Sequence, residues 1–154
     1  MKKRKVIALM VVVIIFIGIL VSFFGIPQYR FNKDYDSPHD LTPEQTIEKL
    51  FDYINNNSPK QANIILLESK YGAFSFNTII SAHVNNIDDF GSPPDKEKYK
   101  NYYDSKQYLV SYDISYLPFA EEKVFWGPSG SIFFVLVKET EDSDWKIADM
   151  YTGV

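Results

Sequence analysis

The stretch KQYLVSYDISY at residues 106–116 decides the fold of this chain, because its side chains alternate between two chemical classes. One class is apolar or aromatic and comprises Tyr108, Val110, Tyr112, Ile114 and Tyr116. The residues between them are mostly polar: Leu109, Ser111, Asp113 and Ser115. Successive side chains of a β-strand point to opposite faces, so this alternation predicts a strand with one covered face and one solvated face.

Further strands are predicted on both sides of this stretch. Thr78–Ile87 is rich in β-branched residues and is followed by the chain-breaking sequence GSPP at residues 91–94. Three later segments are predicted as a weak strand, a strong central strand and a closing strand: Glu122–Trp126, Ser131–Glu139 and Trp145–Tyr151. The charged segment Asp95–Lys106 is predicted as either a loop or one helical turn. Together these segments predict an antiparallel meander of about four strands.

Two helices are predicted before the sheet. The sequence TPEQ at residues 42–45 offers a capping threonine, a proline at the first helical position and a glutamine that completes a capping box. The apolar residues that follow at helical spacing are Ile47, Leu50, Phe51 and Ile54. The sequence SPKQ at residues 58–61 repeats this signal and predicts a second helix to about Glu68. Two or three helices before an antiparallel meander predict an α+β fold, with the helices packed on one face of a curved sheet.

The N-terminal segment predicts a membrane anchor. Val6–Ile26 is an unbroken apolar run of 21 residues that directly follows the basic sequence KKRK at residues 2–5. A helix of that length rises about 31 Å, which matches the roughly 30 Å hydrocarbon core of a bilayer. The four cations predict a cytoplasmic N-terminus, so residues 27–154 are expected to be extracytoplasmic. The lipid bilayer is therefore one expected partner, through Val6–Ile26.

The alternative for this segment is a cleaved signal peptide, which would make the mature protein secreted. A signal peptide has an apolar region of about 7–15 residues and a small-residue cleavage site. Here the run is longer and no alanine lies between Met10 and Gln61, which favours a retained single-pass anchor. The predicted organisation is a basic tip and transmembrane helix at 1–26, a polar stalk at 27–40 and one outer domain at 41–154.

The outer part of the chain is acidic. All 20 Asp and Glu residues follow Ile26, whereas four of the 16 Lys and Arg residues precede Val6, so the formal charge of residues 27–154 is near −8. Such a surface repels nucleic acid, which is therefore not an expected partner. The chain has no cysteine, which excludes disulfides, thiolate metal sites and cysteine nucleophiles. No cofactor or metal is expected.

Two parts of the sequence resemble a known family. The opening LTPE at residues 41–44, the helix pair and the ending WKIAD at 145–149 with Thr152-Gly153 resemble exported bacterial domains of unknown function in the cystatin-like, cone-shaped superfamily named after nuclear transport factor two. The resemblance spans about residues 41–154. It implies a concave pocket between helices and sheet but no particular activity, since the superfamily holds enzymes, ligand binders and interaction domains. Many members are anchored by a lipidated cysteine, which this chain would replace with Val6–Ile26.

Few residues offer catalytic chemistry. His83 lies in the first predicted strand, and it would serve as a general base in the cone pocket if Asp113 or Asp149 faced it across the sheet. Its competing interpretation is a half-exposed strand histidine without a chemical role. Strand alternation predicts that Asp149 shares a face with Trp145 and Ile147, as a structural hydrogen-bond acceptor or a pocket acid. Neither histidine has zinc-protease spacing.

Two further groups have both a functional and a structural interpretation. The tyrosine row 108, 112 and 116 would either line a ligand pocket or form a core face whose hydroxyls reach the rim. The acidic sequence ETEDSD at 139–144 lacks the spacing of a calcium loop and predicts a solvated hairpin tip.

These observations predict a membrane-anchored, extracytoplasmic, non-catalytic domain that binds an envelope protein or another envelope component. A small-ligand sensor or carrier that uses the cone pocket is the second hypothesis, with Tyr108, Tyr112 and Tyr116 as its lining. A pocket enzyme of the isomerase or dehydratase type, with His83 as its base and Asp113 or Asp149 as its partner, is the third.

Overall fold

The computed structural model of the chain describes residues 10, 12–15, 38–67, 78–118 and 126–152. Residues 1–31 and 32–154 form two separate compact units. In the first unit, Met10 and residues 12–15 are helical and exposed, while the rest of the predicted anchor Val6–Ile26 and most of the stalk lie outside the described residues. No helix within the described ranges has both the length and the hydropathy to cross a bilayer.

The second unit contains the predicted antiparallel meander. Its four strands are β1 (Ile79–Gly91), β2 (Asp104–Tyr116), β3 (Ser129–Lys138) and β4 (Lys146–Tyr151), and their spatial order follows their sequence order. Each strand pairs antiparallel with the next. The predicted four-strand sheet is therefore confirmed. Of the weak strand predicted at Glu122–Trp126, residues 122–125 lie outside the described residues and Trp126 is in a bend.

The helices form where the capping signals predict them. The capping box is present at the start of α2 (Pro43–Asn55): the Gln45 N–H donates to Thr42 Oγ1 at 3.2 Å, and the Thr42 N–H donates to Gln45 Oε1 at 2.9 Å. The second helix, α3 (Pro59–Ile65), ends earlier than the prediction of about Glu68. It ends because the next residues become extended, and the Leu67 N–H donates to the Ile147 carbonyl at 2.9 Å.

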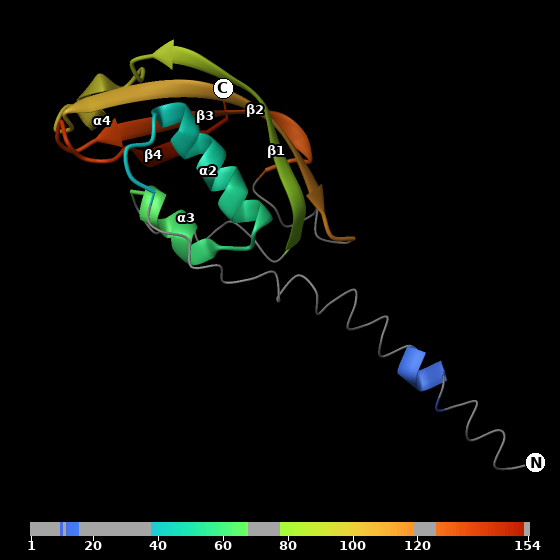
Figure 1. Ribbon diagram of the computed structural model, residues 1–154. Helices are drawn as coiled ribbons and strands as arrows, with labels where there is room; N and C mark the ends of the chain where they lie inside the picture. Colours follow the sequence, from blue (N-terminus) through green and yellow to red (C-terminus); the bar gives the residue numbers. More distant parts are fainter. Residues whose placement is uncertain (1–9, 11, 16–37, 68–77, 119–125, 153–154) are drawn as a thin grey trace, which may run out of the picture. The chain divides into compact units, whose positions relative to one another are not determined.

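Helix α2 packs against the concave face of the sheet, which curves around it in Figure 1. Its predicted apolar residues are all buried, and they pack with the alternating row of β2 and the inward side chains of β3 in one core. We call this covered side of the sheet the inner face. The opposite side, which we call the outer face, is partly covered at one end by the single-turn helix α4 (Lys96–Tyr99), whose Tyr99 is buried. The helical-turn alternative for 95–106 is therefore confirmed for four residues.

Helix α2 also covers part of the open edge of the sheet. Asn55, the last residue of α2, donates from Nδ2 to the Ala82 carbonyl at 2.8 Å and accepts the Ala82 N–H on Oδ1 at 2.6 Å. The side-chain amide thus pairs with the backbone of β1 as a neighbouring strand would. An unpaired edge strand invites association with other chains, so this pairing protects the edge at Ala82.

Candidate functional site

The predicted tyrosine row lies in the core of the inner face. Tyr108 and Tyr112 are buried between the sheet and α2, and Tyr116 lies at the end of the same row. The Tyr116 hydroxyl donates to the Trp126 carbonyl at 2.8 Å, and burial raises the pKa of Tyr116 to about 12. The Tyr112 ring packs on Trp126 with 5.2 Å between centroids. These rings therefore contribute to packing within the described residues.

Tyr108 also approaches the start of α2. Its hydroxyl is buried without a hydrogen-bond partner among the described residues, and burial together with the nearby Glu44 carboxylate raises the pKa of Tyr108. Burial opposes ionisation of Glu44, but its backbone N–H and the nearby Tyr108 hydroxyl lower the Glu44 pKa overall. A carboxylate in the first turn of a helix is also favoured by the helix dipole. Glu44 is thus held as an anion at the rim of the core.

His83 and Asp113 lie next to each other on the outer face. They are direct register partners of β1 and β2, and both are exposed. Their neighbours Ala82 and Ile114 point into the core, so His83 and Asp113 point away from it. Asp113 accepts a hydrogen bond from Asn85 Nδ2 at 2.8 Å. Asp113 therefore faces His83 across the two strands, as the general-base hypothesis requires, but on the solvated side of the sheet rather than toward the helices.

The prediction that Asp149 shares a face with Trp145 and Ile147 was wrong. In the pairing of β3 with β4, the register shifts between Val135 and Leu136, which pair with Asp149 and Ile147 respectively. The extra residue, Ala148, is a β-bulge that moves Asp149 to the outer face. There its Oδ2 accepts hydrogen bonds from Lys98 Nζ at 2.5 Å and from the Tyr99 hydroxyl at 3.2 Å.

This contact fastens α4 to the sheet. The hydrogen bond to Asp149 raises the pKa of Lys98, and burial raises the pKa of Tyr99. Under this one-turn helix lies a small apolar cluster of the outer face, formed by Tyr99, Val135 and Val137 with Leu67, Tyr102, Ala148 and Tyr151 packed around it. Asp149 is consequently a structural acceptor, far along the sheet from His83.

Next to that cluster, four apolar side chains cross the outer face, one from each strand. We call them the outer strip: Phe90, Leu109, Phe133 and Tyr151. Leu109 and Tyr151 are the direct register partners of Phe133. The Phe133 ring packs edge-on against Phe90 at 5.3 Å and stacks on Tyr151 at 5.5 Å between centroids. Phe90 is 54% exposed, and the other three are half-buried.

The sequence carried a signal for only part of this strip. Leu109 is the one apolar residue in the polar set of residues 106–116, and Phe133 and Phe134 together place an aromatic ring on each face of β3. Phe90 stands between an aspartate and a glycine, where the register of β1 with β2 shifts. Its contact with Phe133 depends on that irregular pairing, which no local pattern predicts.

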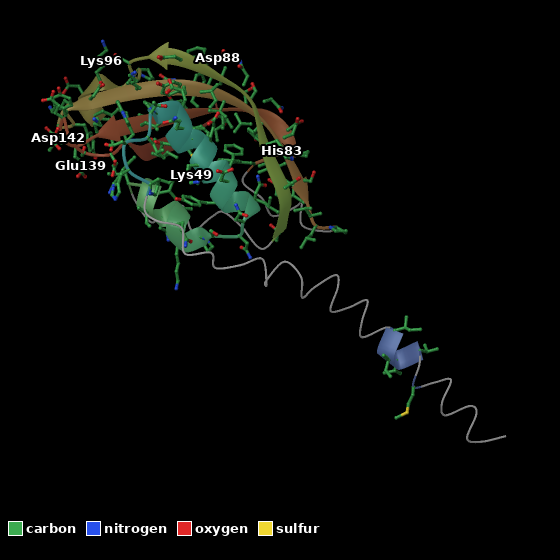
Figure 2. All side chains as sticks on the ribbon, viewed as in Figure 1. Lys49, His83, Asp88, Lys96, Glu139 and Asp142 are labelled. Carbon is green, nitrogen blue, oxygen red and sulfur yellow. The ribbon has the colours of Figure 1, made fainter. Side chains whose placement is uncertain are left out.

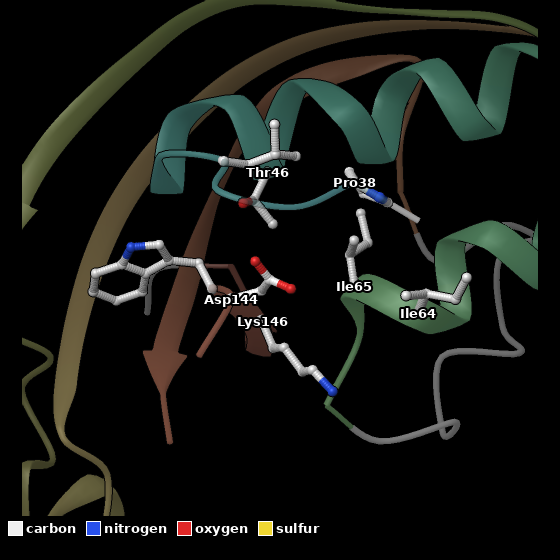
Figure 3. A pocket seen from close by; sticks show the side chains of 8 residues that line it. Pro38, Thr46, Ile64, Ile65, Asp144 and Lys146 are labelled. Carbon is white, nitrogen blue, oxygen red and sulfur yellow. The ribbon is translucent and has the colours of Figure 1, made fainter. Parts of the chain in front are cut away.

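A second surface feature lies at the hairpin that joins β3 to β4, where Figure 2 labels Glu139 and Asp142. Two adjoining hollows of about 110 and 340 Å³ share Leu41, Asp144 and Trp145, and we call them the hairpin cleft. Figure 3 shows the Asp144 carboxylate between Thr46 of α2 and Ile65 of α3. Lys106 Nζ and Lys138 Nζ lie 5.9 and 6.0 Å from the centroid of the Trp145 ring.

The Asp144 carboxylate ties the end of the predicted stalk to this hairpin. Its Oδ2 lies 3.1 Å from His39 Nδ1, and its Oδ1 accepts the Asp40 N–H at 3.0 Å. Burial alone would raise the Asp144 pKa, but the Asp40 N–H and the His39 side chain lower it overall. Asp40 adopts a left-handed backbone with φ of 58°, which the hydrogen bond to Asp144 helps to hold.

Within the described ranges, no three His, Asp or Glu side chains are placed to hold a metal ion. Of the predicted site residues, the structure brings together His83 with Asp113, and Tyr108, Tyr112 and Tyr116 with one another. It separates Asp149 from both groups.

Comparison with known proteins identifies the domain but no activity. A family described as a domain of unknown function, DUF4829, matches residues 44–150, which lie within the predicted outer domain. No curated protein and no solved structure matches the chain. The match covers most of the chain, including all four strands except the final residue of β4. The chain therefore belongs to the DUF4829 family.

Proposed function

We propose that this protein is a membrane-anchored, extracytoplasmic interaction domain without catalytic activity. The proposed anchor is Val6–Ile26, with the N-terminus in the cytoplasm and residues 27–154 outside. The proposed partner is an envelope protein that binds the outer face of the sheet. Support for a non-catalytic role comes from the placement of the chemically capable residues: His83 and Asp113 are exposed, and Asp149 is committed to Lys98.

The observation that carries the proposal is the outer strip. A strand-borne phenylalanine with 54% of its surface exposed, in contact with a second half-buried phenylalanine, contributes nothing to the core of α2 and the inner face. Contiguous exposed apolar surface on a soluble domain typically marks an interaction site, and aromatic residues are enriched in such sites. An interaction role explains why these rings occupy the solvated side.

We also propose that the domain is a cystatin-like cone of the superfamily named after nuclear transport factor two. The supporting features are the α2–α3 pair at the N-terminal end, the antiparallel meander and the curvature of the sheet around α2 (Figure 1). A fold of this kind is compatible with binding and with catalysis, so the fold by itself supports neither.

A second candidate function is small-ligand binding, and the hairpin cleft favours it. The larger hollow, of about 340 Å³, has the size of a small-molecule site, and Trp145 offers it an aromatic wall. Its polar lining includes two carboxylates of the hairpin tip, Glu141 and Asp142. A ligand that occupies it would raise the melting temperature of the protein in a concentration-dependent way, and Trp145→Ala would abolish that rise.

The test of the proposed function is affinity capture of the full-length chain from membranes solubilised in mild detergent. Residues 1–37 alone serve as the control for proteins held by the anchor. We expect a discrete partner on the full-length chain that is absent from the control. Capture of the same proteins by both, or of none, would contradict the interaction role.

A further inference from the structure

We infer that the outer strip docks a basic, apolar segment of a second protein, with the positive charge of that segment directed toward β1. This inference rests on the proposed interaction function and names the chemistry of the partner. Three properties of the described residues carry it: the shape of the strip, its rigidity and the charges around it.

The strip is a continuous apolar surface that crosses all four strands. Phe133 is its centre, with Leu109 and Tyr151 beside it in register and Phe90 in edge-on contact. Toward one end of the sheet the surface joins the apolar cluster under α4, and toward the other end it stops at the hydrogen-bonded pair Ser111 and Ser131, whose hydroxyl oxygens are 2.9 Å apart. A ligand is therefore confined to a narrow band across the strands.

The strip is also rigid before anything binds. Its side chains come from paired strands, and the ring contacts of 5.3 and 5.5 Å restrict the rotation of Phe133. Association is weakened by the loss of side-chain freedom, so a surface that is already ordered binds more tightly for the same area. Aromatic side chains with few rotatable bonds are suited to such a role.

The charges around the strip select the partner. Asp88 is exposed and is the register partner of Leu109 on β1, so it lies beside the strip on the outer face, whereas Asp89 is the register partner of the inner-facing Tyr108. Figure 2 shows Asp88 toward the end of β1 that is remote from His83. At the β4 side, Asp149 is neutralised by Lys98 at 2.5 Å. The β1 side of the strip is therefore negative and the β4 side is balanced.

This asymmetry disfavours a second copy of the chain and favours a cation. Two copies meeting through the strip would bring acidic domains together, since residues 27–154 carry a formal charge near −8. Like charges across an interface are repulsive, whereas complementary charge increases both the rate and the specificity of association. An arginine or lysine of the partner would form two favourable interactions: an ion pair with the Asp88 carboxylate and a cation–π contact with the exposed Phe90 ring.

The test uses the full-length chain in uncharged detergent micelles and a twelve-residue peptide in which arginine and leucine alternate. A second peptide, with glutamate in place of arginine, is the charge control. Binding is followed by chemical-shift changes in two-dimensional NMR spectra, which also locate the bound peptide. We expect the shifts to centre on Phe90, Leu109, Phe133 and Tyr151, and the glutamate peptide to leave the spectrum unchanged.

Three variants separate the strip from non-specific attraction. Phe133→Ala is expected to weaken binding of the arginine peptide about tenfold, because it removes the central aromatic contact. Asp88→Asn is expected to weaken binding of the same peptide about threefold. Glu48→Gln removes one exposed charge from α2, which packs on the inner face, and is expected to change nothing. If Phe133→Ala does not fold, Phe90→Ala tests the same contact at a side chain that is 54% exposed.

Several results would overturn the inference. Shifts centred on the hairpin tip, equal effects of Asp88→Asn and Glu48→Gln, or binding of the glutamate peptide would each show that the strip does not select a basic apolar segment. A concentration-dependent dimer that Phe133→Ala abolishes would assign the strip to a second copy instead. A membrane partner captured equally by the natural chain and by Phe133→Ala would overturn the docking site and the placement of the partner on the outer strip, while leaving an interaction role for the domain.

Discussion

Phe133 and Phe134 are neighbours in β3, and they belong to two different surfaces of one sheet. Phe134 is fully buried in the core between the inner face and α2, where it contacts Trp126 edge-on at 6.0 Å. Phe133 is half-buried on the outer face, between Phe90 and Tyr151. The same residue type, one position apart, therefore serves the fold on one side and is left at the surface on the other.

The difference follows from what covers each face. On the inner face, α2 buries an entire row of side chains, so every aromatic ring there has neighbours on all sides. On the outer face, α4 is the only described helix, and it has one turn. Its contact through Lys98 and Asp149 covers the cluster at Val135 and Val137 but leaves Phe90 exposed. We expect mutations on the two faces to differ in kind.

The largest expected effect is on the inner face. Phe134→Ala should lower the free energy of unfolding by about 3–5 kcal/mol, because it removes a fully buried ring and leaves a cavity. The matched variant Phe133→Ala should lower the free energy of unfolding by only about 1 kcal/mol, because this ring is half-buried. Urea denaturation followed by circular dichroism measures both values. Equal losses would show that the two faces do not differ in their contribution to the fold.

The next effect concerns the ionisation of the inner tyrosines. Burial raises the pKa of Tyr116 from 10.0 to about 12. A pKa that is raised on folding stabilises the fold below the unfolded value, and this stability is lost as the pH rises from about 10 through about 12. The loss should be about 2–3 kcal/mol. Tyr116→Phe, which cannot ionise, should reduce this alkaline loss, and denaturation curves at pH 9, 10 and 11 test it.

Asn55→Ala tests the edge of the sheet, which belongs to neither face. The substitution removes two hydrogen bonds to Ala82, at 2.8 and 2.6 Å, and leaves the backbone groups of Ala82 without that partner. The free energy of unfolding is expected to fall by about 1–3 kcal/mol. Asn56→Ala is the control, because its side chain bonds the exposed Asp52 carbonyl at the end of α2. A loss no greater than that of the control would argue against edge protection by Asn55.

The smallest expected effect is at the hairpin cleft. Asp144 has a lowered pKa, so its contribution to stability is present above the unfolded value near 3.8 and is lost as the pH falls through the folded value. Its side chain is 37% exposed, so solvent screening limits the contribution, and Asp144→Asn should cost about 0.5–1 kcal/mol at neutral pH. The difference from the natural protein should shrink as the pH falls below 3.8. A difference that grows in acid would contradict this assignment.

Much of the fold was predictable because its signals are local. The alternation at residues 106–116 gave β2, and the threonine, proline and glutamine at residues 42–45 gave the start of α2. The early end of α3 was not predictable, because Leu67 leaves the helix to pair with Ile147, 80 positions later in the chain. Tertiary pairing outweighs helix propensity there.

The candidate site was less predictable for the same reason. The general-base hypothesis for His83 required Asp113 or Asp149 to face it, and Asp113 does, but the covered side of the strand could be assigned only from which residues α2 buries. The bulge at Ala148 reversed the face of Asp149, and a single extra residue of this kind leaves no periodic signal. The outer strip depends on contacts between four strands, so it could be identified only from the register in which the strands pair.

The central claim is that a partner binds the outer strip and not the polar end of the outer face. Site-specific photocrosslinking in the native membrane tests this most directly. A benzophenone side chain is introduced into the full-length chain at Phe90, in the outer strip, and separately at Ser115, on the polar end of the same face. We expect a discrete crosslinked product from position 90 that is absent from position 115. The same product from both positions, or none from position 90, would contradict the assignment of the outer strip as the binding surface.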